Sequence, residues 1–333
     1  MAKDTKIIIT IPPFAKFGEV SESPLVEGVR FNTTLPLDES PEEVLSTIKK
    51  EANGKDVWID LKCRQLRITS HVVEIAREQE IHCIDLNHKI KVNLPADVMA
   101  DNGNYRAKIS SIINGNRLII PSSNEKGEGF PLANSGKVGM RPGMSITILD
   151  PSLEIQGYLT EKDKGYVEAA KNIGLHNYML SFVEKEQDIE DMLALDDKAK
   201  IVAKIESKKG LEFVANSYPK YAKKISLMAA RGDMYLELDR PEDMASACSA
   251  IIKQDKNAMI ASRMLESLMK GGNPDNQDIF DIYCGMLMGY RRFMLGDDVC
   301  RCKESSRNAI EIIGNLAEKY KQENGKNIFH NGK

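Results

Sequence analysis

Short apolar runs recur along the chain and alternate with segments that have helical patterns. Each run has the length of a buried strand, and most are followed by the amphipathic spacing that is typical of a helix. Eight runs fit this description: residues 6–13, 28–32, 57–61, 178–182, 201–205, 224–229, 258–261 and 292–295. Eight strands with intervening helices favour an α/β fold of the TIM (β/α)8 barrel type over an open sheet.

Several of the expected helices have end signals in the sequence. Ser40 is placed to cap a helix that begins with proline and acidic residues, and Thr160 is placed to cap another that ends at Gly174. A third helix is expected to begin at Pro241, and residues 307–322 form the last. Only about fourteen residues join the first two strands, so the first helix is expected to be short or missing.

Residues 68–156 interrupt this alternation. Three segments within them alternate apolar and polar residues, at 89–95, 105–121 and 144–150. Turn sequences such as ADNGN and INGN separate these segments, which indicates a small antiparallel β domain. We therefore expect a barrel domain made of residues 1–67 and 157–333, and a β-barrel domain at 68–156 inserted after the third strand.

Polar side chains gather at the ends of the predicted strands. Residues i and i+2 of a strand face the same way, so Val202, Lys204 and Glu206 share one face. In a barrel the helices cover the outer face, which places Lys204 and Glu206 inside, at the rim where barrel enzymes have their active sites. A structural ion pair would explain these two residues equally well. Recurrence favours a functional rim, since VRFN, WIDLKCRQLR, AARGD and ASRML follow the same pattern.

Composition narrows the classes of protein. The chain has 333 residues, 42% hydrophobic and 29% charged, with a formal net charge of −3, which gives no reason to expect nucleic-acid binding. No apolar stretch has the length of a membrane span, and the N-terminus lacks a signal-peptide pattern. The six scattered cysteines are typical of reduced thiols. We expect a cytoplasmic protein that binds a small molecule and no membrane. A homo-oligomer is compatible with the sequence, which does not decide the oligomeric state.

The motifs VAKIESKKG, MAARGD and ASRMLES, in this order, resemble those of the pyruvate kinase family. The resemblance extends to TKIIITIPP, VRFNTT, IDLKCRQLR and LTEKD, and so covers nearly all of the chain. It implies a TIM barrel with an inserted β-barrel domain that acts as a lid, which agrees with the periodicity. Because the chain ends after the eighth expected helix, we do not expect the family's regulatory C-terminal domain.

The resemblance implies roles for individual residues at the barrel rim. Lys204 matches the lysine that stabilises charge on the phosphoryl group and the enolate. Glu206 and Asp233 match the two carboxylates that hold a divalent metal, Mg²⁺ or Mn²⁺. Arg30 matches the arginine that contacts the transferring phosphate, and Arg67 matches a second cation at the same site.

Further matched positions concern the substrate, the monovalent cation and the nucleotide. The backbone N–H groups of Gly232 and Asp233 would hold the substrate carboxylate, and Ser262 replaces a threonine near the enolate. The implied ligands of a monovalent cation are Asn32, Thr34 and Asp60. Gln65 stands where the family residue is tied to K⁺ dependence, so the need for K⁺ stays open. The implied contacts of ADP or ATP are Lys137, Asp101 and Pro13.

Some family motifs have changed, mainly on the nucleotide side. The family's NFSHG is NTTLP here, PTRAE is PDNQD, and SGETA is GDDVC, which keeps an acid at Asp298. Tyr235 replaces a small glycine beside the metal loop and would narrow the pocket. The metal and phosphate residues are therefore kept, whereas the nucleotide edge has diverged.

Three functions fit these observations. The first is a pyruvate-kinase-like phosphotransferase that acts on phosphoenolpyruvate or pyruvate with a divalent metal and ADP or ATP. The second is a metal-dependent lyase or decarboxylase that acts through the enolate of a 2-oxo acid. The third is a non-catalytic relative that binds a metabolite or a partner protein. The presence of Lys204, Glu206 and Asp233 favours catalysis, and ADP binding would separate the classes.

Overall fold

The computed structural model describes residues 4–34, 37–76, 79–100, 103–122, 140–270 and 273–325, which form two compact units. As far as they are described, Met1–Thr33, Glu39–Leu61 and Gly165–Lys333 make up the first unit, and Thr34–Asp38 and Lys62–Lys164 make up the second. The chain thus passes between the units near residues 62 and 164, compared with 68 and 157 in the prediction from periodicity.

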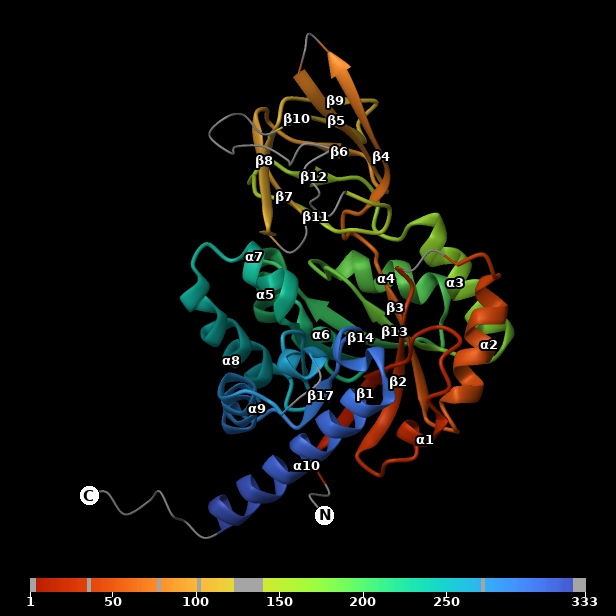
Figure 1. Cartoon of the computed structure of the whole chain (residues 1–333), viewed down its shortest axis with the longest axis vertical. Helices are drawn as coiled ribbons and strands as arrows, with labels where there is room; N and C mark the ends of the chain where they lie inside the picture. The colour runs from red at the N-terminus through yellow and green to blue at the C-terminus, as the bar shows by residue number, and fades with distance from the viewer. Residues whose placement is uncertain are drawn as a thin grey trace, which may run out of the picture. The chain divides into compact units, whose positions relative to one another are not determined.

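Eight parallel strands of the first unit close into a barrel (Figure 1). Around the barrel the order is β1, β17, β16, β15, β14, β13, β3, β2. Their bounds are β1 Lys6–Thr10, β2 Val26–Asn32, β3 Asp56–Leu61, β13 Asn177–Leu180, β14 Lys200–Ile205, β15 Ile225–Ala230, β16 Met259–Ala261 and β17 Arg292–Met294. Every predicted apolar run overlaps one of these strands, and the prediction of an α/β TIM barrel is confirmed.

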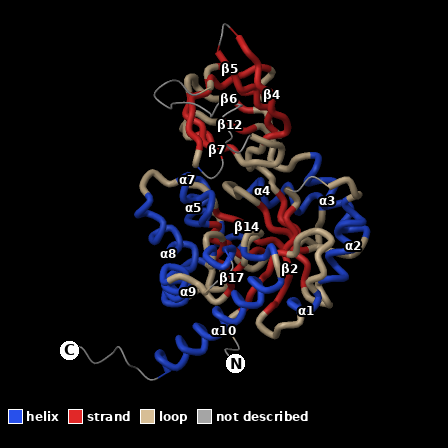
Figure 2. The backbone as a smooth tube through the Cα atoms, in the orientation of Figure 1, coloured by secondary structure: helices blue, strands red, loops and turns tan. Residues whose placement is uncertain are grey.

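Helices surround the barrel strands in Figure 2. The α-helices are α1 Gly18–Ser21, α2 Pro41–Glu51, α3 Glu161–Asn172, α4 Glu186–Leu195, α5 Lys208–Asn216, α6 Tyr218–Tyr221, α7 Arg231–Glu237, α8 Met244–Gln254, α9 Asn276–Met288 and α10 Lys303–Gly325. The 3-10 helices of the described residues include η2 Pro241–Asp243, η3 Glu266–Lys270 and η4 Val299–Arg301. Within the described ranges, no helix is both long enough and apolar enough to cross a membrane.

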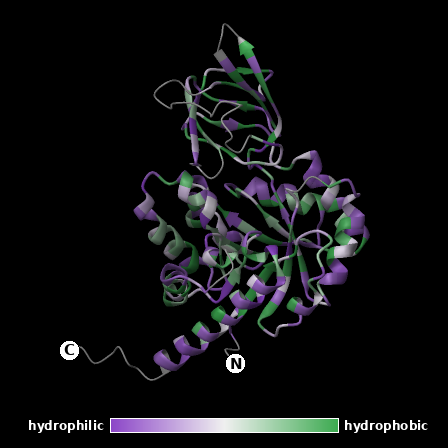
Figure 3. Ribbon diagram, in the orientation of Figure 1, coloured by the Kyte–Doolittle hydropathy of each residue, from purple (hydrophilic) through white to green (hydrophobic). Residues whose placement is uncertain are grey.

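The helix ends follow the predicted chemistry. Ser40 caps α2, and its hydroxyl accepts from the Glu43 N–H while the Glu43 carboxylate accepts from the Ser40 N–H. Thr160 accepts from the Asp163 N–H at the start of α3. The first helix, α1, has only four residues, as the short connection requires. Hydrophilic and hydrophobic residues alternate along α10 in Figure 3, because one face of this helix is buried and the other is exposed.

Apolar side chains fill the inside of the barrel. This interior cluster consists of Ile8, Trp58, Met179, Val202, Met228, Ala230, Met259, Ala261 and Met294. Side chains two positions further along a strand face the same way, which places Thr10, Asp60 and Lys204 inside the barrel above this apolar layer. The alternation read from the sequence therefore assigns the inner face of β14 correctly.

The described part of the second unit is built from β-strands. A four-stranded sheet has the order β4 (Ile68–Ala76), β5 (Gln79–Leu86), β10 (Arg117–Pro121), β9 (Ser111–Ile113). A three-stranded sheet has the order β11 (Ile146–Ile148), β7 (Ala96–Ala100), β8 (Tyr105–Ile109), and a two-stranded sheet pairs β12 (Glu154–Ile155) with β6 (Ile90–Lys91). These strands bury a common core that includes Ile84, Val98, Ile109 and Leu118. Each of the three alternating segments contains at least one strand.

Candidate functional site

Lys204 lies at the centre of a buried group of charges at the C-terminal ends of the barrel strands. Its Nζ donates to the Ser181 hydroxyl at 2.8 Å, and it lies 3.0 Å from Glu206 Oε1 and 3.4 Å from Asp60 Oδ1. Burial opposes the charged ammonium, but the attraction of Asp60 and Glu206 raises the pKa of Lys204 overall. The lysine is therefore a positive charge fixed in position at neutral pH.

Glu206 directly follows β14 and is almost completely buried. Its Oε2 accepts a hydrogen bond from the Phe182 N–H at 2.7 Å. Burial raises the pKa of Glu206 to about 7, with Lys204 opposing the shift and the negative charge of Asp233 adding to it. Asp233 lies in the first turn of α7. A cation between these two carboxylates would relieve their repulsion, so the pair fits a divalent metal.

Two carboxylates are the donor set that Mg²⁺ or Mn²⁺ uses when a substrate supplies further oxygens. Across the described ranges, no group of three or more His, Cys, Asp or Glu side chains is arranged to hold a metal ion. A metal on Glu206 and Asp233 would therefore complete its coordination with oxygens of the substrate or of water. This arrangement suits a metal that binds together with an acid.

Arg30 lies between two carboxylates. Its Nε donates to Asp60 Oδ2 at 2.8 Å, its Nη2 donates to the same oxygen, and its Nη1 donates to Asp297 Oδ2 at 2.8 Å and to Thr10 Oγ1 at 3.0 Å. Burial opposes the charge, but Asp297 and Asp60 raise the pKa of Arg30. The register of β2 and β3 places Asn32 opposite Asp60, and Asn32 Nδ2 donates to Asp297 Oδ2 at 2.9 Å.

Gly232 and Ser262 lie close together at neighbouring strand ends. A Cβ atom on Gly232 would be 3.4 Å from the Ser262 Cβ and 3.6 Å from the Ser262 hydroxyl oxygen, so the two residues are neighbours. The φ angles of Ser262 and Arg263 are +69° and +55°, in the left-handed region that few non-glycine residues adopt. Gly232 and Asp233 belong to the first turn of α7, where amides have no acceptor within the helix.

The sequence matches the family described as pyruvate kinase, barrel domain, over residues 2–303. The chain belongs to the pyruvate kinase family. It is 27% identical over 212 residues to the pyruvate kinase of Naumovozyma castellii, covering 61% of this chain and 39% of the relative. It is 24% identical over 321 residues to the pyruvate kinase of Borreliella burgdorferi, covering 88% of this chain and 63% of the relative. The chain thus spans less than two thirds of these two relatives.

The crystal structure of Cryptosporidium parvum pyruvate kinase has the same fold. It superposes with a TM-score of 0.73 at 18% sequence identity, covering 96% of this chain and 71% of that one. The resemblance to the pyruvate kinase family inferred from the motifs is therefore confirmed, and the barrel rim described above is the part of this family member that we take as its candidate site.

Three residues of the rim were not predicted as site residues of this pyruvate kinase family member: Thr10, Ser181 and Asp297. The sequence does contain a signal for Thr10, because it lies two positions after Ile8 on β1 and so faces the barrel interior as Ile8 does. Ser181 directly follows β13, and Asp297 lies three residues beyond β17, where no periodicity fixes the direction of a side chain.

The acid that the family's SGETA motif places at position 298 lies at the surface, and the acid before it reaches Arg30. Asp298 matches the acid of that motif, but it forms an ion pair with Arg301 at 2.6 Å, and both side chains are more than half exposed. The preceding residue, Asp297, is the one that reaches Arg30. The path of the loop after β17 therefore directs Asp297 to Arg30 and Asp298 to the surface.

Three further predicted residues, Pro13, Arg67 and Thr34, fall within the described ranges. Pro13 lies in the turn after β1. Arg67 and Thr34 belong to the second unit, where Arg67 donates to the Gln65 side chain and to the Gly143 carbonyl oxygen. Lys137 and Asp101 lie outside the described residues, so their predicted nucleotide contacts stay predictions.

The Tyr235 ring is partly covered by another residue of the rim. Arg263 lies over this ring at 4.7 Å from its centroid, and the tyrosine remains 41% exposed. This contact is a cation–π interaction, and it links α7 to the loop that follows β16. Tyr235, the side chain that was expected to narrow the pocket, is therefore held in place by Arg263.

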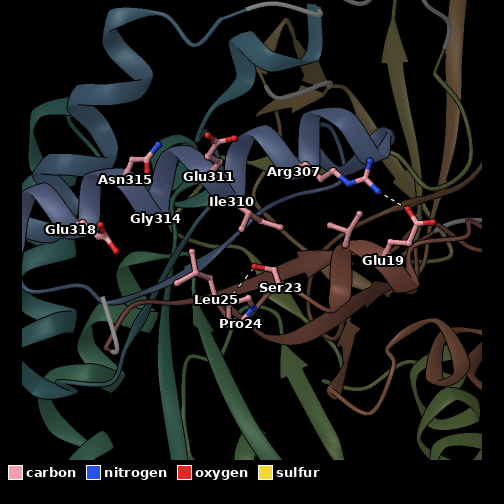
Figure 4. A pocket seen from close by; sticks show the side chains of 11 residues that line it. Glu19, Ser23, Pro24, Leu25, Arg307, Ile310, Glu311, Gly314, Asn315 and Glu318 are labelled. Atoms are coloured by element: carbon pink, nitrogen blue, oxygen red, sulfur yellow. Dashed lines mark hydrogen bonds and ion pairs between the residues drawn. The ribbon is translucent and has the colours of Figure 1, made fainter. Parts of the chain in front are cut away.

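A pocket of the first unit, about 420 Å³ in volume, is lined by none of these residues (Figure 4). It is formed by α10 together with the segment from α1 to β2, and Figure 4 shows Leu25 and Ile310 among its lining residues. Arg307 donates to Glu19 at 2.5 Å at one end. Since no predicted site residue lines this pocket, we keep the charge group around Lys204 as the candidate site.

Divalent metal should bind more tightly as pH rises through about 7. Below that pH a proton on Glu206 competes with the metal, so the affinity for Mn²⁺ should fall roughly tenfold per pH unit. Electron paramagnetic resonance titrations of Mn²⁺ between about pH 5.5 and about pH 8.5 measure this dependence. An affinity that stays constant over that range would contradict it.

The stability of the metal-free protein should change in the opposite direction. The folded-state pKa of Glu206 lies above its ordinary value, so this carboxyl contributes stability that is fully present below about pH 4.5 and is lost as pH rises through about 7. Glu206→Gln should flatten this part of the pH profile of thermal unfolding. If the melting temperature of the wild type rises between about pH 4.5 and about pH 7, and this rise is lost in Glu206→Gln, the pKa of Glu206 is not raised in the folded state.

Proposed function

We propose that this pyruvate kinase family member is a phosphotransferase that acts on phosphoenolpyruvate or pyruvate, with a divalent metal and ADP or ATP. The observation that carries the proposal is the buried group of Lys204, Arg30 and Glu206 at the C-terminal end of the barrel. Phosphoryl transfer is catalysed mainly by positive charge positioned around the phosphoryl and leaving oxygens. Lys204 and Arg30 supply two such charges, each held by carboxylates.

A divalent metal on Glu206 and Asp233 would supply the charge that stabilises the enolate and carboxylate oxygens of the acid. Lys204 is already oriented by Ser181, Glu206 and Asp60, so its ammonium need not reorganise when negative charge develops. A substrate oxygen would replace the weakest of these contacts, the one of 3.4 Å to Asp60. Asp60 would then remain paired with Arg30.

The monovalent cation and the nucleotide belong to the proposal through the family resemblance. A K⁺ ion on Asn32 and Asp60 would share the Asp60 carboxylate with Arg30 and Lys204. If K⁺ changes the activity, we therefore expect it to do so by changing how Asp60 positions the Arg30 side chain. The nucleotide contacts of Lys137 are tested by ADP binding.

A lyase or decarboxylase that acts on a 2-oxo acid through a metal-bound enolate is the second candidate. The ion pair between Arg30 and Asp297 favours this candidate, because it engages the arginine that would contact a phosphoryl group. The metal carboxylates and Lys204 would serve this reaction without a nucleotide.

A single set of assays separates these functions. Phosphoenolpyruvate with ADP, Mg²⁺ and K⁺ should yield pyruvate, which a coupled lactate dehydrogenase assay detects. The activity should require both metal and ADP. Pyruvate formed from oxaloacetate, and none from phosphoenolpyruvate, would favour the second candidate. If neither reaction occurs but oxalate with metal raises the melting temperature, the chain is a binding protein and the proposal fails.

A further inference from the structure

Asp297 reaches from the loop after β17 to residues of β2. Its Oδ2 accepts from Arg30 Nη1 at 2.8 Å and from Asn32 Nδ2 at 2.9 Å. The Asp297 side chain is 46% exposed, whereas that of Arg30 is 7% exposed. A carboxylate that is accessible to solvent is therefore paired with an arginine that is almost buried.

Most donors of Arg30 are already directed at acceptors of the protein. A guanidinium has five N–H groups, of which one on Nε and one on Nη2 donate to Asp60, and both on Nη1 donate to Thr10 and Asp297. Asp60 and Thr10 are buried in the barrel. Asp297 is thus the acceptor that can leave Arg30 without a rearrangement of the interior.

We propose that Asp297 determines the substrate preference of the site, because it occupies the Arg30 donor that a phosphoryl group requires. A 2-oxo acid that binds through a metal on Glu206 and Asp233 has no phosphoryl group to place at Arg30, and so would leave the ion pair intact. A phosphorylated acid must displace Asp297 and place its doubly charged group close to that carboxylate. The inference rests on the proposed function, since it takes this site to bind such acids.

The neighbouring residue provides a matched control. Asp298 is one position further along the same loop, but its carboxylate pairs with Arg301 at the surface, whereas the described hydrogen bonds of Arg30 go to Asp60, Thr10 and Asp297. Asp298→Asn therefore removes the same charge from the same loop without changing the partners of Arg30. Asp297→Asn keeps an oxygen that can accept from Arg30, and so separates the charge of Asp297 from its geometry.

Isothermal titration calorimetry with phosphoenolpyruvate and with oxalate, each in the presence of Mn²⁺, tests the inference. Asp297→Asn should bind phosphoenolpyruvate about tenfold more tightly than the wild type, because a repulsive charge next to the phosphoryl group is lost. Oxalate, which has no phosphoryl group, should change by less than about threefold. Asp297→Gly should increase the affinity for phosphoenolpyruvate at least as much as Asp297→Asn does. The control variant Asp298→Asn should change the affinity for neither ligand.

Equal tightening of both ligands, or the same effect in Asp298→Asn, would overturn the inference in favour of a general charge effect. Weaker phosphoenolpyruvate binding in Asp297→Asn would also overturn it, because Asp297 would then help to position Arg30 for the phosphoryl group. If both ligands bind, and the ratio of their affinities is the same in Asp297→Asn as in the wild type, the inference fails but the proposed function does not. If neither ligand binds the wild type or any variant, the proposed function fails and the inference with it.

Discussion

Lys204→Met is expected to lower the rate of phosphoryl transfer by about 10²–10³, or roughly 3–4 kcal/mol in the barrier, because one preorganised positive charge is lost. The ammonium is fixed by Ser181, Glu206 and Asp60, and methionine fills a similar volume without charge. Initial rates of pyruvate formation, measured with saturating metal, give the effect. Lys200→Met, the same change at the exposed start of β14, should leave the rate unchanged.

The stability of the Lys204→Met variant separates a catalytic lysine from a structural one. Breaking a buried ion pair costs about 3–5 kcal/mol when the remaining charge cannot be neutralised. Here Glu206 can take up a proton, because its pKa is already raised to about 7. The melting temperature should therefore be close to that of the wild type at about pH 6 and lower at about pH 8.5. A variant that melts far lower at both values and keeps its specific activity would show that Lys204 is structural.

Glu206→Gln is expected to weaken Mn²⁺ binding by more than about 100-fold. Replacing a residue that only orients a metal ligand already lowers metal affinity by about 10–100-fold, and Glu206 would be a ligand itself. Glutamine retains an oxygen that can accept from the Phe182 N–H, so the metal-free fold should persist. Calorimetric titration with Mn²⁺ in the presence of oxalate measures the change.

Glu212→Gln serves as the control for the change at Glu206. Glu212 is an exposed residue of α5, in the helix that follows Glu206 along the chain. Its replacement should leave the affinity for Mn²⁺ as it is in the wild type. If Glu206→Gln binds the metal as tightly as Glu212→Gln does, the metal does not bind at Glu206, and the pair with Asp233 has another purpose.

The positions of the barrel strands could be predicted from the sequence because a strand buried on both faces is a short apolar run. The direction of Lys204 also followed from alternation, since Val202 belongs to the interior cluster. The strands β4 and β5 were not distinguished within the inserted segment. Their mixture of charged and apolar residues gives a weaker signal than a buried strand does.

The loop residues of the site could not be predicted in the same way. Asp297 and Asp298 are adjacent and chemically identical, and only the path of the chain after β17 decides which one reaches Arg30. Ser181 likewise follows a strand and enters the site through its contact with Lys204. Alternation fixes directions within a strand and ends where the strand ends, so these assignments needed the structure.

Enolate stabilisation at Lys204 is tested most directly by exchange of the methyl protons of pyruvate with solvent deuterium. We expect the wild type, with Mg²⁺ and either ATP or phosphate, to accelerate this exchange, as followed by proton nuclear magnetic resonance. The acceleration should require the metal, disappear in Lys204→Met and persist in Lys200→Met. Equal exchange by the wild type and Lys204→Met, or no metal-dependent exchange by the wild type, would contradict the role assigned to the charge group at the barrel rim.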